Sequence, residues 1–273
     1  MGLLRFFTLI LFLIMIIVPA IGNPDVLEFR IDYYHSLISI NAEKEVKPGK
    51  YGNIFDWQLN AALKLEDEVF KGFIKAVSNI RFDAWNYGRD LLLEDLTLNE
   101  KLFNYIKEKI LLQPSYTDNS VKVEVEFPFF GENGFVPIIY KAGMDIGRFP
   151  VYPVTEFSTD FTGLVIDARG LNRKPAIAPK IFDEEHNLVY FVDFIYPEYF
   201  KKWGEVGYTD DPYYHDLRDR VGDNPMRVVA LKNEKLMETD ITISNRDASI
   251  LLQYEGTKEN LKQGRVIIII DYK

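Results

Sequence analysis

The sequence predicts an α+β protein of two small domains, each a mostly antiparallel sheet with one or two helices packed on it. Short alternating or β-branched runs, long amphipathic segments in the first half, and turn residues between the extended runs all point to this class. The length of 273 residues favours about two domains. A hydrophobic content of 47 % with 14 % aromatic residues excludes a globally disordered chain.

We expect the first domain at residues 24–145. It should open with a strand over residues 31–46, followed by a helix over residues 57–78 that Asp56 caps. Apolar residues recur every three or four positions along this helix, which predicts one buried face. That face should contain the following residues: Leu59, Ala62, Leu63, Val69, Phe70, Phe73, Ile74 and Val77.

The rest of the first domain carries one more helix and a predicted hairpin. Residues 98–112 are amphipathic with helical spacing, and Pro114 ends them. Residues 121–130 alternate apolar and charged side chains, which is typical of a half-buried strand. A glycine-containing turn then leads to residues 135–140 as the partner strand. This order of elements predicts helices on one face of an antiparallel sheet.

We expect the second domain at residues 146–273, organised around the segment TGLVIDARG that begins at Thr162. Extended segments at residues 176–182 and 188–192 flank a polar turn, which predicts a hairpin. The apolar run RVIIIID at residues 265–271 predicts a terminal strand in the centre of its sheet.

Asp167 and Arg169 lie two residues apart on the predicted strand of this segment, so their side chains share a face. We interpret them as an ion pair or hydrogen-bond clamp that holds the loop at Gly170. A role in catalysis is the alternative. The acidic turn Asp183–Glu185 is interpreted as a solvated hairpin tip, since it lacks the spaced oxygen ligands that Ca²⁺ requires.

Residues 1–22 have the features of a signal peptide. Arg5 precedes a nearly uninterrupted apolar run over residues 6–18, and Pro19 and small residues follow before Asn23. The run is shorter than the ~20 residues that span a bilayer as a helix. The alternative is an uncleaved anchor, which would be the chain's one contact with a membrane. Either way, we expect export to the periplasm or the periphery of the outer membrane of a bacterium.

Composition excludes several function classes. A net charge of −9 without a basic stripe disfavours nucleic-acid binding. The chain has no cysteine, which excludes disulfides, thiolate metal sites and the lipid anchor of a bacterial lipoprotein. His35, His186 and His215 lack zinc-ligand spacing. Phosphate-binding loops and nucleophile motifs are also absent, so we expect no cofactor, no metal and no enzymatic activity.

The organisation resembles bacterial envelope proteins related to the FlgP-type flagellar outer-membrane lipoproteins. One part of the resemblance covers residues 31–130: an initial strand, an alanine-containing helix and a closing VKVEVEF strand. The other covers TGLVIDARG, PAIAPKIFDEE, NPMRVVAL, DITIS, RDASIL and RVIIIID, which are similar to a carboxy-terminal extension in members of that group. The resemblance implies an extracytoplasmic, non-enzymatic role in envelope or flagellar-envelope assembly.

The leading hypothesis is therefore a structural or scaffolding protein whose partners are envelope proteins, including copies of itself. The alternative is a periplasmic ligand-binding module. A third hypothesis, an enzyme, would require Asp167, Arg169, Asp183 and His186 to converge in one pocket. Four aromatic residues are the candidates for interaction in the first hypothesis and for a pocket lining in the second: Tyr196, Tyr199, Phe200 and Trp203.

Overall fold

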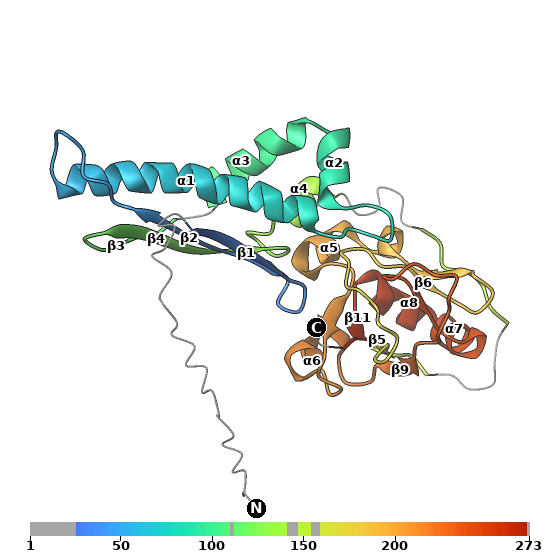
Figure 1. Ribbon diagram of the computed structural model, residues 1–273. Coiled ribbons are helices and arrows are strands. Elements are labelled where there is room, and N and C mark those ends of the chain that lie inside the picture. The colour runs from blue at the N-terminus through green and yellow to red at the C-terminus, as the bar shows by residue number, and fades with distance from the viewer. Residues whose placement is uncertain (1–25, 110–111, 141–146, 154–158, 272–273) are drawn as a thin grey trace, which may run out of the picture.

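A computed structural model describes residues 26–109, 112–140, 147–153 and 159–271 of the chain. The predicted signal peptide lies outside these residues. The described elements form two lobes (Figure 1), one from the elements up to residue 140 and one from those after residue 159. Both lobes combine helices and sheets, which confirms the predicted α+β class.

The first lobe contains a four-stranded antiparallel sheet in the order β1-β2-β4-β3. Its single predicted first strand is in fact two strands, joined by a turn in which Ser36 has a φ of 54°. The alternation in β4 places Val121, Val123 and Phe127 in the core, as expected. The strands are β1 (Val26–Asp32), β2 (Leu37–Glu45), β3 (Ser115–Tyr116) and β4 (Ser120–Pro128).

The long helix α1 (Ile54–Asn79) lies along one face of this sheet (Figure 1). Its N-cap is Asn53, not the predicted Asp56. The Asn53 side chain accepts hydrogen bonds from the backbone N–H groups of Phe55 and Asp56, and the Asp56 carboxylate accepts one from the N–H of Asn53. Asp56 therefore completes a capping box from the third helical position.

Three further helices belong to this lobe: α2 (Gly88–Glu94), α3 (Thr97–Lys109) and α4 (Val136–Ile139). The prediction of a strand at residues 135–140 was wrong, because α4 occupies this position. Pro137 lacks the donor that a strand needs and suits the first turn of a helix. The buried ring of Phe135 packs edge-on against Phe73 and Phe129, with centroids 5.2 and 5.6 Å away.

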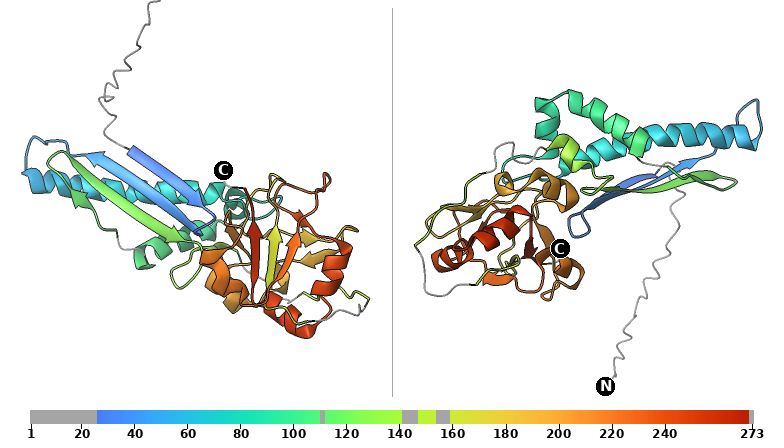
Figure 2. Two further views of the ribbon diagram at one scale, coloured as in Figure 1. Left: turned by 90° about the horizontal axis from the view of Figure 1, so that it is seen from below. Right: turned by 180° about the vertical axis from the view of Figure 1, so that it is seen from behind.

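The main sheet of the second lobe has the order β8-β11-β5-β9, and every neighbouring pair is parallel (Figure 2). This corrects the expectation of a mostly antiparallel sheet in this domain. As predicted, the terminal strand β11 is central, and all four of its residues are buried. The strands are β5 (Leu164–Asp167), β8 (Gly207–Thr209), β9 (Met226–Val229) and β11 (Val266–Ile269).

Parallel strands require crossover connections, and the helices of this lobe lie in those connections. The two 3₁₀ turns are η1 (Val192–Phe194) and η2 (His215–Leu217). The α-helices are α5 (Pro197–Trp203), α6 (Arg218–Val221), α7 (Asn245–Leu251) and α8 (Glu255–Lys262). Ser244 caps α7, since its hydroxyl oxygen accepts a hydrogen bond from the N–H of Asp247.

A second, smaller sheet of this lobe has the order β10-β6-β7. It contains the predicted hairpin, with β6 (Ile181–Phe182) antiparallel to β7 (Leu188–Tyr190). Strand β10 (Ile241–Thr242) is parallel to β6.

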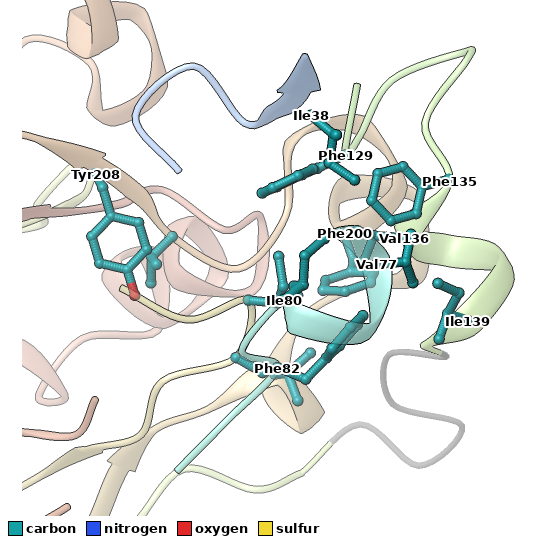
Figure 3. Packing of buried hydrophobic residues seen from close by; sticks show 14 of the residues in the cluster. Ile38, Val77, Ile80, Phe82, Phe129, Phe135, Val136, Ile139, Phe200 and Tyr208 are labelled. Atoms are coloured by element: carbon teal, nitrogen blue, oxygen red, sulfur yellow. The ribbon is translucent and has the colours of Figure 1, made fainter. Parts of the chain in front are cut away.

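Backbone hydrogen bonds join the two lobes. The N–H groups of Ile177 and Ala178 donate to the carbonyl oxygens of Arg81 and Phe82, at 3.0 and 2.6 Å. Figure 3 shows the cluster of buried side chains at this junction, which includes Phe82 of the first lobe and Phe200 of the second. The lobes therefore share a continuous hydrophobic core. Among the described residues, no helix has the length and apolar character needed to cross a bilayer.

Candidate functional site

The predicted ion pair between Asp167 and Arg169 is present at the carboxyl end of β5. The guanidinium group donates from Nε to Asp167 Oδ1 at 2.9 Å and from a second nitrogen to Oδ2 at 2.5 Å. The hydrogen bonds from Arg169 hold the pKa of the Asp167 carboxyl below its usual value. Gly170, with a φ of 77°, is held by a different residue, because its N–H donates to Asp271 Oδ2 at 2.8 Å.

A groove of about 210 Å³ lies between the lobes, near the carboxyl ends of β5 and β11. In parallel sheets this edge is the usual place for a ligand. Arg173 borders the groove and donates to the carbonyl oxygen of Met237 at 3.0 Å. Its buried Nε has no hydrogen-bond partner within the described segments. The lining residues are Arg30, Ile31, Asp32, Tyr33, Tyr34, Arg173, Lys174, Pro175, Ile270 and Asp271.

Asp183 is a structural carboxylate of the β6–β7 hairpin and not a solvated side chain. Its residue is 1 % exposed, and it accepts hydrogen bonds from Tyr152 Oη, from Asn187 Nδ2 and from the backbone N–H groups of Glu185 and Asn187. Burial acts to raise the pKa of Asp183, but the hydrogen bonds from Asn187 and Tyr152 outweigh it and lower the pKa.

The four residues of the enzyme hypothesis do not form one hydrogen-bonded cluster in the described part of the chain. Asp167 pairs with Arg169, whereas Asp183 is bound by its own hairpin. His186 sits in that hairpin with a φ of 68°, and its ring packs against Phe182.

The other two histidines each pair with a nearby carboxylate at the surface. His35 Nδ1 is 3.0 Å from Asp32 Oδ2, and His215 Nδ1 is 2.7 Å from Asp211 Oδ2. Within the residues that the structure describes, no group of three or more histidine, aspartate or glutamate side chains is arranged to hold a metal ion.

The four candidate interaction aromatics on and next to α5 divide into two kinds. Phe200 is 2 % exposed, so it is not available to an external partner. Its ring instead packs against Phe130 and Tyr140 of the first lobe, with centroids 5.5 and 6.1 Å away. Phe200 therefore holds the two lobes together.

Tyr196, Tyr199 and Trp203 are half-buried, and polar contacts fix two of them. Tyr196 Oη donates to Glu259 at 3.1 Å, and Trp203 Nε1 donates to the carbonyl oxygen of Gln263 at 2.8 Å. The ammonium group of Lys202 lies 4.1 Å from the Trp203 ring centroid. These side chains form a fixed surface next to α8.

A row of exposed apolar side chains on α1 was not predicted from the sequence. Phe55, Leu59 and Leu63, which we name the α1 ridge, are 75 %, 57 % and 56 % exposed. Their spacing of four residues places them in one line along the helix. Leu59 and Leu63 were expected in the buried face of α1, so that prediction was wrong for these two residues. They are exposed because α3 covers the other end of α1 (Figure 1).

A groove of about 490 Å³ adjoins the α1 ridge and is named here the α1–α3 groove. Phe70 and Phe103 meet edge-on in it, with ring centroids 5.0 Å apart, and the Lys107 ammonium group lies 4.1 Å from the Phe103 centroid. Leu63 belongs to both the ridge and the groove. The lining residues are Leu63, Glu66, Asp67, Phe70, Phe103, Ile106, Lys107 and Leu112.

Comparison with known families gives one match. Residues 163–272 are similar to a family described as the second domain of Treponema pallidum Tp0624. The matching region begins at Gly163, directly before β5, and contains all four strands of the parallel sheet. It covers less than half of the chain. A search of curated proteins found no match.

Proposed function

We propose that this chain is an exported, non-enzymatic protein of the bacterial cell envelope with a structural or scaffolding role. A flagellar or outer-membrane-associated assembly is the setting that the resemblance to FlgP-type proteins favours. The exposed α1 ridge is the observation on which the proposal rests.

An exposed row of large apolar side chains beside an apolar groove is typical of a protein-interaction surface. Apolar side chains stabilise a protein when their surface is removed from water. The three side chains of the α1 ridge contribute no such stabilisation while they are exposed, but they would contribute to the binding of a partner. By contrast, the acidic groups considered for catalysis already have partners within the protein. Asp167 forms an ion pair with Arg169, and Asp183 accepts hydrogen bonds within its own hairpin. Both facts favour a role in binding other proteins.

Export is supported by the composition of residues 1–22, which matches a signal peptide. Cell fractionation with an antibody against the chain tests it. We expect a processed form, beginning near Asn23, in the periplasmic or outer-membrane fraction. An unprocessed form in the cytosol would contradict the proposal, and a control protein of known cytosolic location shows whether the fractions are clean.

A ligand-binding module is the second candidate, and the groove between the lobes favours it. Arg173 and Lys174 lie in this groove near the carboxyl edge of the parallel sheet, and Arg30 of β1 also lines it. These three side chains would be cationic partners for a small anionic molecule, beside the carboxylates of Asp32 and Asp271. A thermal-shift screen of small carboxylates and phosphates separates the two candidates, since a ligand that binds the native state raises the melting temperature. A shift that the Arg173→Ala variant loses would favour the ligand-binding module.

A further inference from the structure

Strand β1 forms an open edge of the first-lobe sheet (Figure 2). It pairs with β2 on one side along its whole length without a bulge, and no described strand pairs with its other side. Such an edge presents unpaired backbone N–H and C=O groups to another strand. Lysine, proline and bulges commonly block such edges, and β1 has none of them. The other sheet edges among the described residues belong to short strands of two to four residues.

The two faces of β1 differ in chemistry. Leu27, Phe29 and Ile31 lie on the face toward α1, where Phe29 and Ile31 pack against the core of the first lobe. Glu28 and Arg30 lie on the opposite face, and both are exposed. The Glu28 carboxylate has no hydrogen-bond or ion-pair partner in the part of the chain that the structure describes. This face of the edge therefore carries one negative and one positive charge two residues apart.

The alternation of the two faces limits how β1 could pair with a copy of itself. Residues directly opposite each other in an antiparallel pair point to the same face of the sheet. A two-fold axis perpendicular to the sheet must then pass through a residue position, because an axis between two positions would bring residues of different faces opposite each other. The possible registers are therefore centred on single residues of β1.

The charges favour one of these registers. With the axis at Phe29, Glu28 of each copy lies opposite Arg30 of the other copy. Leu27 then lies opposite Ile31 on the face toward α1, and all of β1 is paired because Phe29 is its middle residue. An axis at Glu28 would bring two carboxylates together, and an axis at Arg30 would bring two guanidinium groups together. Registers centred on the remaining residues would pair at most three residues of β1.

We infer that β1 binds β1 of a second copy of the chain, antiparallel and with the two-fold axis at Phe29, so that the two first-lobe sheets join into one. Backbone hydrogen bonds along the edge supply the affinity, and the pairs of Glu28 with Arg30 fix the register. The inference rests on the proposed scaffolding function and deepens it by naming one partner. It uses a surface different from the α1 ridge.

Exchange of the two charges tests the register directly. Sedimentation equilibrium of the chain from Asn23 onward should show a dimer. Glu28→Arg brings two arginines opposite each other and Arg30→Glu brings two glutamates opposite each other, so each single variant should raise the dissociation constant at least about tenfold. The double variant Glu28→Arg/Arg30→Glu restores opposite charges. Its dissociation constant should return to within about threefold of the wild-type value.

Glu124→Arg is the matched control. Glu124 is exposed on the same face of the same sheet, in register with Glu28 through Asn41, but it lies on the inner strand β4. The same change of charge at this position should leave the dissociation constant unchanged. Circular dichroism confirms that each variant is folded.

The absence of native cysteine allows a second test. In a mixture of Glu28→Cys and Arg30→Cys chains, mild oxidation should form the mixed disulfide faster than either chain alone forms its own covalent dimer. Only the mixture brings two thiols directly opposite each other. Leu96→Cys, at an exposed leucine outside β1, is the control and should link slowly.

Three results would overturn the inference. They are a monomer at about 100 µM, a double variant that binds no more tightly than the single variants, and equal rates of linking in the mixture and in Leu96→Cys. Each of these results leaves the envelope location to the fractionation experiment, so failure of this inference is distinguishable from failure of the proposed function.

Discussion

Glu205 and Arg220 are both buried in the second lobe, yet no hydrogen bond or ion pair joins them in the described part of the chain. The Arg220 guanidinium donates instead to the carbonyl oxygens of Gly264, Trp203 and Gly204, at 2.8 to 2.9 Å. Among the residues that the structure describes, neither carboxyl oxygen of Glu205 has a hydrogen-bond partner. Burial raises the pKa of Glu205 well above its usual value and lowers the pKa of Arg220 to about 10.

The first prediction concerns the pH dependence that Glu205 produces. Its folded-state pKa is raised, so the folded protein holds this proton more tightly than the unfolded chain. The contribution of protonated Glu205 to the free energy of unfolding is fully present below the unfolded pKa of ~4.3. This contribution decreases as pH rises from there toward the folded pKa. The Glu205→Gln variant lacks this titration. Relative to wild type, it should gain up to ~1.4 kcal/mol of unfolding free energy per pH unit over that range.

Urea unfolding at several pH values between 5 and 8 measures this difference. The control is Glu198→Gln, at an exposed position of α5, which should run parallel to wild type. Equal pH dependence of wild type and Glu205→Gln would show that Glu205 does not hold its proton in the folded state.

Removal of the charge on Asp183 should destabilise the second lobe. The two carboxylate oxygens of Asp183 accept hydrogen bonds from Tyr152 and Asn187. In the Asp183→Asn variant an NH₂ group, which cannot accept a hydrogen bond, replaces one of these oxygens. We expect a loss of ~2–3 kcal/mol at pH 7, as for other hydrogen bonds to a charged group. Because the folded pKa of Asp183 is lowered, its contribution to the free energy of unfolding is fully present above the unfolded pKa of ~3.9 and is lost as pH falls. The stabilities of the variant and of wild type should therefore converge in acid.

Denaturant unfolding at pH 7 and pH 3 tests the effect of Asp183. Asp211→Asn is the comparison, since Asp211 is bonded at the surface to His215 and this substitution should cost much less than Asp183→Asn. If Asp183→Asn cost no more than Asp211→Asn, the hydrogen bonds of the hairpin would not be contributing to stability.

Truncation of Phe200 should weaken the contact between the lobes. Its ring packs against Phe130 and Tyr140, and the Phe200→Ala variant should lose ~3–5 kcal/mol, as other buried phenylalanines do. Calorimetry should then show two separate transitions in place of one, because the shared core is interrupted. Phe127→Ala is the control, because Phe127 is also buried but packs against Phe73 within the first lobe. This variant should destabilise the first lobe and leave the contact between the lobes intact. A single cooperative transition in Phe200→Ala would count against the role of this contact.

Two glycines should respond very differently to alanine. A Cβ at Gly88 would lie 1.9 Å from the carbonyl oxygen of Val77, whereas a Cβ at Gly170 would meet nothing within 4 Å. Gly170→Ala should therefore cost about 1–2 kcal/mol, the price of a left-handed backbone at φ 77°. Gly88→Ala should cost more, because α2 must move away from α1. The denaturant midpoints of unfolding of the two variants measure the difference in stability. A larger loss in Gly170→Ala than in Gly88→Ala would contradict the close packing of α2 against α1.

Local elements were the most predictable part of this fold. The alternation in β4 and the apolar run of β11 both appear where the sequence predicts them. The Asp167–Arg169 pair was also predicted, although β5 ends at Asp167 and Arg169 lies in the turn after it, where its backbone N–H also donates to Asp167 Oδ1. Each of these features depends on residues within a few positions of one another.

The candidate surface was less predictable. The pattern of α1 gives one apolar face, but it does not reveal that Tyr105 of α3 packs against this face at Phe73 while Leu59 remains exposed. Likewise, nothing near Phe200 in the sequence identifies Phe130 as its partner. Coverage of a side chain depends on elements that are distant in sequence, so a local pattern contains no information about it.

The sequence by itself determined the α+β class, the helices α1 and α3, the strands β4 and β11, and many of the apolar residues that form the cores, because periodicity is local. Only the tertiary structure decided three features: the main sheet of the second lobe is parallel, residues 136–139 form the helix α4 and not a strand, and the α1 ridge remains in solvent. These features are set by packing between distant segments, whose free energy depends on the whole folded chain.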